Sequence, residues 1–331
     1  MTESSSYGRS VEVSWPLGPT TVYGTVLMPE GAGPFPGVVL VAGSGPTDRD
    51  WNSPLLPGAN GSGHLLAEAL VRAGFASLRY DKRASGPHVR ETIPLLIGAI
   101  TMQSHVDELD GAVRTLAEQH SVNHHRIFGL GNSEGTLHVL NYQVDEPGIP
   151  FAGLVLTAPP GRSVGAVARS QLAAQAKGIP NGEEFLRLYD AAVARFLAGE
   201  PAAPDPALPE GVRTLIASLE SPYNLPFARE LWTADGAAPL EKVRLPVLII
   251  IGKKDLQVDW QADAVPLQRA AAELTNVSFI FPEDANHVLK HESRPREELA
   301  QAEVMLRYNA DDASLDAETA AAIVAWLTAQ T

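Results

Sequence analysis

Runs of apolar residues alternate with amphipathic stretches over most of this 331-residue chain. Short continuous apolar runs are typical of strands buried on both faces of a sheet, and apolar positions every three or four residues are typical of helices. This alternation predicts an α/β fold with a mainly parallel central sheet and helices on both faces. The predicted strands are residues 38–41, 75–80, 126–130, 151–156, 246–251 and 277–281, and the predicted helices are residues 65–73, 103–118, 136–144, 262–272 and 315–329.

Three stretches depart from this alternation. Residues 11–15 and 21–27 alternate in polarity around a Pro-Leu-Gly-Pro turn, which predicts an antiparallel hairpin at a sheet edge. Residues 294–312 are charged and helix-prone, which predicts a solvated face. The third stretch, residues 161–243, contains no strand pattern, and its predicted helices are residues 164–176, 182–198, 210–219 and 226–234.

We interpret residues 161–243 as an inserted helical cap, or lid, on a core formed by residues 1–160 and 244–331. We expect most of the larger apolar side chains of the cap to pack it onto itself and the core. A few of them should line a substrate pocket.

The composition narrows the classes of function. A formal net charge of −14 disfavours nucleic acid and anionic membrane surfaces as partners, because both repel it. The chain has no Cys, which excludes a disulfide, a thiol nucleophile and a thiolate metal site. Residues 1–10 lack an apolar signal core, and no run approaches the roughly 20 residues of a membrane span. We therefore expect a soluble cytoplasmic protein, and the sequence leaves a homo-oligomer open.

The stretch Gly131-Asn132-Ser133-Glu134-Gly135 stands between a predicted strand and a predicted helix. A strand, a sharp turn and a helix with Ser at the apex is the nucleophile elbow, in which small flanking residues permit a strained turn. The turn exposes the Ser133 hydroxyl and places the Glu134 N–H at a helix start, where it can face a developing negative oxygen. An ordinary Gly-rich turn can contain the same letters, so the flanking strand and helix carry the interpretation.

A Ser hydroxyl needs a base within hydrogen-bond reach, and the base needs an orienting acid. His287 directly follows the last predicted strand, and His291 is its nearest alternative. Asp255 follows the strongest predicted strand, and Asp259 is its alternative. Active sites in parallel sheets lie at the carboxyl ends of the strands, so we expect Asp255 and His287 to lie near Ser133.

The loop at residues 42–50 follows another buried strand and contains Gly43, Ser44 and Gly45. Small side chains leave the backbone amides of such a loop open to an anionic oxygen. The alternative is an ordinary Gly/Pro turn. The elbow farther along the chain makes us favour the anion-binding role.

The chain order Ser133, Asp255, His287 resembles that of the α/β-hydrolase superfamily, and the resemblance covers nearly the whole chain. The segments Gly-Ser-Gly-Pro-Thr-Asp-Arg-Asp at 43–50 and Arg-Tyr-Asp-Lys-Arg at 79–83 resemble a serine carboxylesterase branch with a helical cap. The resemblance implies oxyanion donors at the backbone N–H groups of Ser44 and Glu134. It also implies that no metal or organic cofactor is needed.

Two positions depart from the pattern of these relatives. Ala42 stands where many relatives carry His, and Ala84 stands where Gly is frequent after Asp-Lys-Arg. The neighbouring charges are interpreted as a structural set that forms ion pairs and orders the loops. These charged residues are Asp48, Arg49, Asp81, Lys82 and Arg83.

The predicted function is cleavage of small to medium apolar carboxylic esters through an acyl-enzyme, with a small-molecule ester as the partner. The same residues can serve a peptidase, thioesterase, lactonase or acyltransferase, because a fold does not fix its substrate. A non-catalytic binding protein on the same scaffold is the alternative of a different class.

Overall fold

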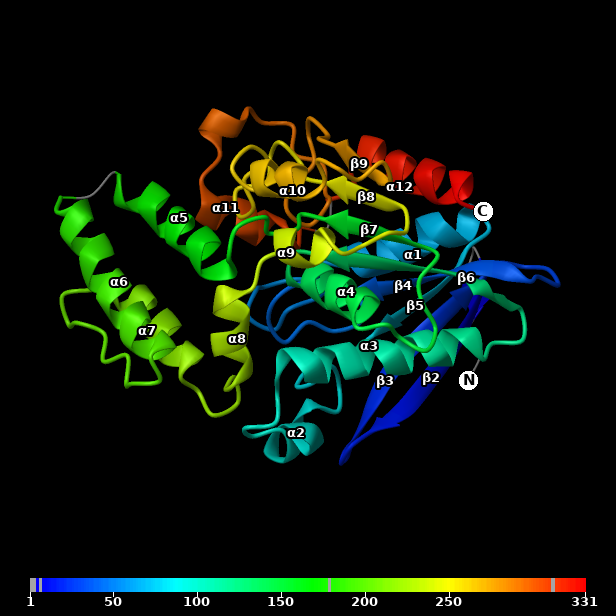
Figure 1. Ribbon diagram of the computed structural model, residues 1–331, viewed down its shortest axis with the longest axis horizontal. Helices are drawn as coiled ribbons and strands as arrows, with labels where there is room; N and C mark the ends of the chain where they lie inside the picture. Colours follow the sequence, from blue (N-terminus) through cyan, green and yellow to red (C-terminus); the bar gives the residue numbers. More distant parts are fainter. Residues whose placement is uncertain (1–3, 6–7, 178–179, 311–312) are drawn as a thin grey trace.

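The computed structural model describes residues 4–5, 8–177, 180–310 and 313–331, and its centre is a nine-stranded sheet (Figure 1). The strand order is β1-β2-β3-β5-β4-β6-β7-β8-β9. Neighbouring strands from β5 to β9 in this order run parallel, and β1, β2 and β3 extend the sheet in antiparallel pairs. The prediction of a mainly parallel sheet is confirmed. The strands are β1 (Ser4–Ser5), β2 (Gly8–Leu17), β3 (Thr20–Met28), β4 (Phe35–Val41), β5 (Ala76–Tyr80), β6 (Val122–Asn132), β7 (Gly153–Thr157), β8 (Val247–Ile250) and β9 (Val277–Ile280).

Helices cover both faces of the sheet, as predicted, because the central strands are apolar on both sides. In β4, Val39 and Val41 face one hydrophobic cluster, whereas Val38 and Leu40 face the other. The first cluster includes side chains of α3, α4, α9 and α10, and the second includes side chains of α1 and α12. These helices are α1 (Ser62–Arg72), α3 (Met102–Ala117), α4 (Glu134–Val144), α9 (Ala237–Leu240), α10 (Ala264–Ala270) and α12 (Ala317–Ala329).

The N-terminal hairpin is also confirmed, with β2 and β3 paired in antiparallel register from Arg9–Met28 to Leu17–Thr20. It lies near one end of the sheet, where only β1 is added beyond it. Two short elements between β5 and α3 were not predicted: α2 (Val89–Thr92) and the 3-10 helix η1 (Ile93–Leu95). No helix in the described part of the chain combines the length and apolar character that crossing a membrane requires.

Four predicted helices lie between β7 and β8, and Figure 1 shows α6 and α7 projecting to one side, away from the sheet. They enclose a hydrophobic cluster of their own, which includes Tyr189, Phe196 and Ile216. The insertion is joined to the core where Phe227 N–H donates to the Ile100 carbonyl at 3.0 Å. The function of these helices as a lid stays a prediction. They are α5 (Val164–Ala176), α6 (Gly182–Leu197), α7 (Glu210–Leu219) and α8 (Phe227–Thr233).

The charged segment differs in part from its prediction over residues 294–310, and residues 311–312 lie outside the described part of the chain. It forms a 3-10 helix, η2 (Arg296–Glu298), and a helix, α11 (Gln301–Arg307). Val304 and Tyr308 are 1% and 3% exposed and pack against Val288. A solvated face is therefore wrong for these positions, since two apolar residues four apart turn one side of the segment inward.

Glycine lets α4 begin directly against the central strand. A Cβ added at Gly135 would lie 2.6 Å from the carbonyl oxygen of Ala42 and would also overlap the carbonyl oxygen of Val41. A Cβ added at Gly131 would lie 2.6 Å from the backbone of Gly135. The turn between β6 and α4 therefore excludes side chains on both sides, as the elbow pattern predicts.

Replacing Gly135 with Ala should lower the free energy of unfolding by about 2 kcal/mol or more, because the methyl group meets backbone that cannot move aside. Urea unfolding followed by circular dichroism measures the change. Gly211→Ala is the matched control, since a Cβ there meets no heavy atom within 4 Å and Ala favours helix α7 by up to about 1 kcal/mol. Equal destabilisation of the two variants would contradict the close approach at Gly135.

Candidate active site

Ser133 occupies the turn between β6 and α4 in a strained backbone conformation, with φ 52° and ψ −121°. Positive φ is uncommon for a residue with a side chain and is held only where the surroundings determine it. Here the Ser133 N–H donates to the carbonyl of Thr157 in the neighbouring strand β7 at 2.8 Å. The strand, strained turn and helix predicted from the sequence are all present.

His287 and Asp255 lie together after the last two strands of the sheet. The His287 ring nitrogen Nδ1 is 2.8 Å from the Asp255 Oδ2 atom, and the Asp255 side chain is fully buried. The other carboxylate oxygen accepts hydrogen bonds from the backbone N–H groups of Gln257 and Val258. An ionised Asp255 can only accept, so Nδ1 carries the hydrogen and leaves Nε2 as the free acceptor.

Asp259 and His291, the alternatives to Asp255 and His287, have other partners. Asp259 forms an ion pair with Arg296 at 2.8 Å, and His291 faces Asp316 at 3.5 Å. Asp255 and His287, the two residues preferred from the sequence, are therefore the pair that is in hydrogen-bond contact.

Two close contacts bring the loops of Ser133, Asp255 and His287 to one place. A Cβ added at Gly252 would lie 2.7 Å from the carbonyl carbon of Ala285, so the loop after β8 packs on the loop after β9 through a bare backbone. The Asn132 amide donates to the His287 carbonyl at 3.1 Å, which joins the loop after β9 to the residue before Ser133. The second contact relies on Asn132, a residue of the Gly131–Gly135 stretch.

Ser133, His287 and Ser44 line one cavity of about 350 Å³. Gly43 lies against the turn, because a Cβ added there would be 3.4 Å from the Ser133 Cβ. Glu134 follows as the first residue of α4. The structure thus gathers the predicted residues at the carboxyl ends of the strands, and their catalytic roles belong to the proposal below.

The walls of this cavity were not predicted. Its apolar lining includes Trp51, Leu55 and Leu56 from the loop before α1, and Met305 and Tyr308 from the segment around α11. Among the described residues, none from 161–243 lines it, so the expected cap residues are absent from its wall. No signal in the sequence marks these walls. Residues 51–60 have no periodic pattern of apolar positions, and the polar residues around Met305 mask the apolar side of that segment, which faces inward.

The helical insertion borders a second cavity of about 540 Å³, between α5 and the loop after β8. Its lining includes the polar side chains of Gln171, Arg162 and Arg296 beside apolar ones such as Leu256 and Leu299. Gln257 borders both cavities, and its amide donates to the Tyr308 hydroxyl at 3.0 Å. Gln257, two residues beyond Asp255, is therefore common to the walls of both cavities.

The loop at residues 43–50 is fixed by the segment after β5. The Arg49 guanidinium pairs with Asp81 at 2.8 Å, and the Ser85 hydroxyl donates to the Thr47 carbonyl at 2.7 Å. The predicted loop-ordering ion pair is confirmed for these two charges. Ala84 has φ 61°, so it holds the left-handed conformation in which Gly costs least, at a position where the resembling family frequently has Gly.

A parallel sheet flanked by helices, with a strained Ser turn and a His–Asp pair at the strand ends, defines an α/β hydrolase. Residues 38–302 match the family described as alpha/beta hydrolase, and the chain belongs to that family. It is 30% identical over 276 residues to Esterase EstD of Thermotoga maritima, covering 80% of this chain and 57% of that protein. The chain thus spans little more than half the length of this relative.

Solved structures agree on the fold. The proline iminopeptidase of Mycobacterium smegmatis superposes with a TM-score of 0.55 at 17% identity, over 97% of this chain and 98% of the other. An esterase of Pyrococcus furiosus gives a TM-score of 0.56 at 16% identity, over 97% and 91%. At such identities the likeness concerns the fold alone.

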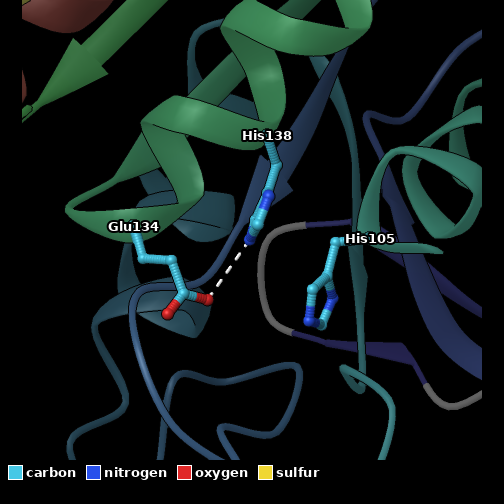
Figure 2. Close-up of side chains that lie close together, drawn as sticks. All are labelled: His105, Glu134 and His138. Atoms are coloured by element: carbon cyan, nitrogen blue, oxygen red, sulfur yellow. Dashed lines mark hydrogen bonds and ion pairs between the residues drawn. The ribbon is translucent and has the colours of Figure 1, made fainter. Parts of the chain in front are cut away.

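Beneath the elbow lies a buried charged cluster that was not predicted from the sequence (Figure 2). Glu134 points inward from α4, and its Oε1 atom accepts hydrogen bonds from Lys82 at 2.5 Å and from His138 Nε2 at 3.2 Å. The His105 ring lies next to that of His138, with centroids 4.7 Å apart, and its Nδ1 faces Glu108. The side chains of Lys82, Glu134 and His138 are at most 4% exposed.

Protonation in this cluster is set by burial and charge together. Burial alone would raise the pKa of the Glu134 carboxyl, but the Lys82 ammonium and the His138 hydrogen bond outweigh it and hold that pKa well below its usual range. Burial lowers the pKa of His138 to about 4, and Glu134 offsets only part of this effect. His138 is therefore neutral at pH 7 and donates from Nε2 to the carboxylate.

Stability should rise with pH between about 4.5 and 6.5. The pKa of His138 is about 4 in the folded protein, below its ordinary 6.5, so the unfolded chain binds more protons in this window. The full effect is on the order of 3 kcal/mol and is lost as the pH falls. In His138→Gln the amide still donates to Glu134 but does not titrate, so this part of the slope should disappear. Urea unfolding at several pH values measures it, and an unchanged slope would refute the assignment.

Proposed function

We propose that this protein is a serine carboxylesterase in which Ser133 is the nucleophile, His287 the base and Asp255 the orienting acid. The observation that carries the proposal is the 2.8 Å contact between His287 and the buried Asp255, beside a cavity that His287 shares with Ser133. Membership of the α/β hydrolase family and the similarity to an esterase support the same chemistry. The proposed oxyanion donors are the backbone N–H groups of Ser44 and Glu134.

The first half of the proposed reaction forms an acyl-enzyme. His287 Nε2 takes the Ser133 proton as the Ser133 oxygen attacks the ester carbonyl, and Asp255 holds the ring through Nδ1 and stabilises its charged form. The carbonyl oxygen becomes negative and is held by the two amides. His287 then protonates the departing alcohol as the carbon–oxygen bond breaks.

The second half repeats these steps with water. His287 removes a proton from water as the water oxygen attacks the acyl carbon, and the same amides hold the negative oxygen. Collapse of this intermediate releases the acid and returns the proton to Ser133. Burial of Asp255 keeps solvent away from the pair, which strengthens its electrostatic support of the charged ring.

The cavity supports an ester with an apolar group of small to medium size. Its volume of about 350 Å³ is at the low end of the range for small-molecule sites, and Leu56, Val288 and Met305 give it an apolar wall. Peptidase activity with the same residues would have to protonate an amine leaving group.

Asp255→Asn should lower kcat for p-nitrophenyl esters on the order of 10⁴-fold by misplacing the hydrogen on His287.

Ser133→Ala should abolish labelling by a fluorophosphonate and lower kcat for p-nitrophenyl esters by at least about 10⁴-fold, because no other group can form the acyl-enzyme. Ser53→Ala is the matched control, since Ser53 lines the same cavity but has no proposed role. Labelling that persists in Ser133→Ala would exclude Ser133 as the nucleophile. A parent protein without labelling or turnover would favour a binding role.

A series of p-nitrophenyl esters of increasing acyl length should show a sharp optimum in kcat/KM, because the cavity is bounded. Leu56→Trp should move the optimum to shorter chains, whereas Leu215→Trp, on the exposed face of α7, should not. Aminoacyl p-nitroanilides assayed in parallel separate an esterase from a peptidase. An optimum that Leu56→Trp leaves in place would show that the acyl group lies outside this cavity.

A further inference from the structure

Lys82 joins the two segments that carry the proposed oxyanion donors. Its ammonium donates to the Gly43 carbonyl at 2.9 Å and to the Glu134 carboxylate at 2.5 Å. Gly43 precedes Ser44, and Glu134 follows Ser133, so one side chain from the end of β5 bridges both sides of the candidate site. The Lys82 side chain is 4% exposed, and the bridge is therefore shielded from water.

The contact between Lys82 and the Gly43 carbonyl also fixes the direction of the Ser44 N–H. The Gly43 carbonyl and the Ser44 N–H belong to one planar peptide group, and in a trans peptide they point in opposite directions. The cis peptide bonds of the described chain lie elsewhere, at Gly33–Pro34 and Leu225–Pro226. A donor that fixes the Gly43 oxygen on the Lys82 side therefore turns the Ser44 N–H to the other side. The positive charge also polarises the peptide group and makes its N–H a stronger donor.

The contact with Glu134 acts on the second donor. Glu134 is the first residue of α4. Its side chain is held in the interior by Lys82 and His138. Its backbone N–H lies in the first turn of the helix, where no intrahelical carbonyl accepts it. Because the same ammonium holds Gly43, the separation between the Ser44 and Glu134 amides is tied to one group.

We propose that Lys82 is a positioning residue that orients the Ser44 amide and sets its separation from the Glu134 amide, so that both donors meet the developing oxyanion. This inference rests on the proposed esterase function. It assigns to Lys82 a task beyond ordering a loop, and it involves no contact between Lys82 and the substrate.

His105, Glu134 and His138 also form a group whose ligand atoms lie within 4.8 Å of one another, the spacing of a metal site. Lys82 decides against that interpretation, since its ammonium already meets the Glu134 oxygen that His138 contacts. A divalent cation at this point would face a positive charge in a low-dielectric interior. The Lys82 ammonium and the neutral His138 ring instead keep the Glu134 carboxylate in place under the turn.

The test uses Lys82→Met combined with Glu134→Gln, assayed in the full chain. The single change Lys82→Met leaves a buried carboxylate unpaired, which endangers folding. The double variant removes both charges, and the amide oxygen that replaces the Glu134 carboxylate can still accept from His138. Melting temperature and near-UV circular dichroism report whether the double variant is folded.

The expected result is a loss of about 10²-fold in kcat with KM changed by no more than about threefold, because the donors act on the transition state. Affinity for a trifluoromethyl ketone, which adds to Ser133 and places an anionic oxygen between the same amides, should fall by a similar factor. A folded double variant with kcat and inhibitor affinity within about threefold of the parent would overturn the inference.

Arg229→Met is the matched control. The Arg229 guanidinium donates to the Phe196 carbonyl at 2.9 Å, so it also anchors a backbone oxygen, but within the helical insertion and away from Gly43. The control should lose stability and keep kcat within about threefold. An equal loss of kcat in this control and in Lys82→Met/Glu134→Gln would reduce Lys82 to a general structural role and overturn the inference.

Two further measurements keep the outcome decisive. If Lys82→Met/Glu134→Gln does not fold, Lys82→Arg takes its place, since it keeps the charge opposite Glu134 but cannot reproduce the ammonium geometry. Loss of inhibitor affinity at unchanged KM then supports the inference, and parent-like affinity overturns it. A metal bound stoichiometrically to the parent and lost in His105→Ala would also overturn it.

The inference and the proposed function fail in different ways. A parent protein that neither reacts with a fluorophosphonate nor hydrolyses esters ends the esterase proposal whatever Lys82 does. A parent that does both, beside an unaffected Lys82 variant, ends the positioning proposal alone.

Discussion

The approach of helix α4 to the central strand β4 is the constraint on which the rest of the site depends. The first turn of α4 passes so close to the carbonyls of Val41 and Ala42 that no side chain fits at Gly135. This approach places the end of β4, with Gly43, directly against Ser133. The loop that begins with Gly43 and the candidate nucleophile are therefore neighbours for a packing reason. The φ of 52° at Ser133 is the backbone strain that this arrangement requires.

Close packing at the turn has an electrostatic consequence. A helix pressed onto the sheet turns its first side chain, Glu134, into the interior, where an unpaired carboxylate would be costly. Lys82 and His138 supply its partners, and the cluster continues through His105 to Glu108 and Arg83. Buried ion pairs of this kind add little net stability over apolar packing, and they demand one geometry. The demand for one geometry is the property that a site built from backbone amides needs.

Periodicity predicted the sheet, its covering helices and the strand ends at which Ser133, Asp255 and His287 stand. These features are local, because the apolar run of β8 carries its own signal of burial. The meeting of Lys82 with Glu134 has no such signal, since the two residues are 52 positions apart and only the packing of α4 joins them. The inward face of Tyr308 was hidden in the same way, by charged neighbours that outnumber the apolar positions.

The candidate reacting groups and the walls of the cavity come from different parts of the chain. Strand ends carry the proposed reacting groups, while residues 51–60 and 305–309 wall the space beside them. The helical insertion borders the second cavity and contacts the loop after Asp255, where Gln171 donates to the Gln257 carbonyl. Gln257 in turn binds the Tyr308 hydroxyl. Two hydrogen bonds therefore link α5 to Tyr308 in the wall of the apolar cavity, by a connection that does not involve the turn that holds Ser133.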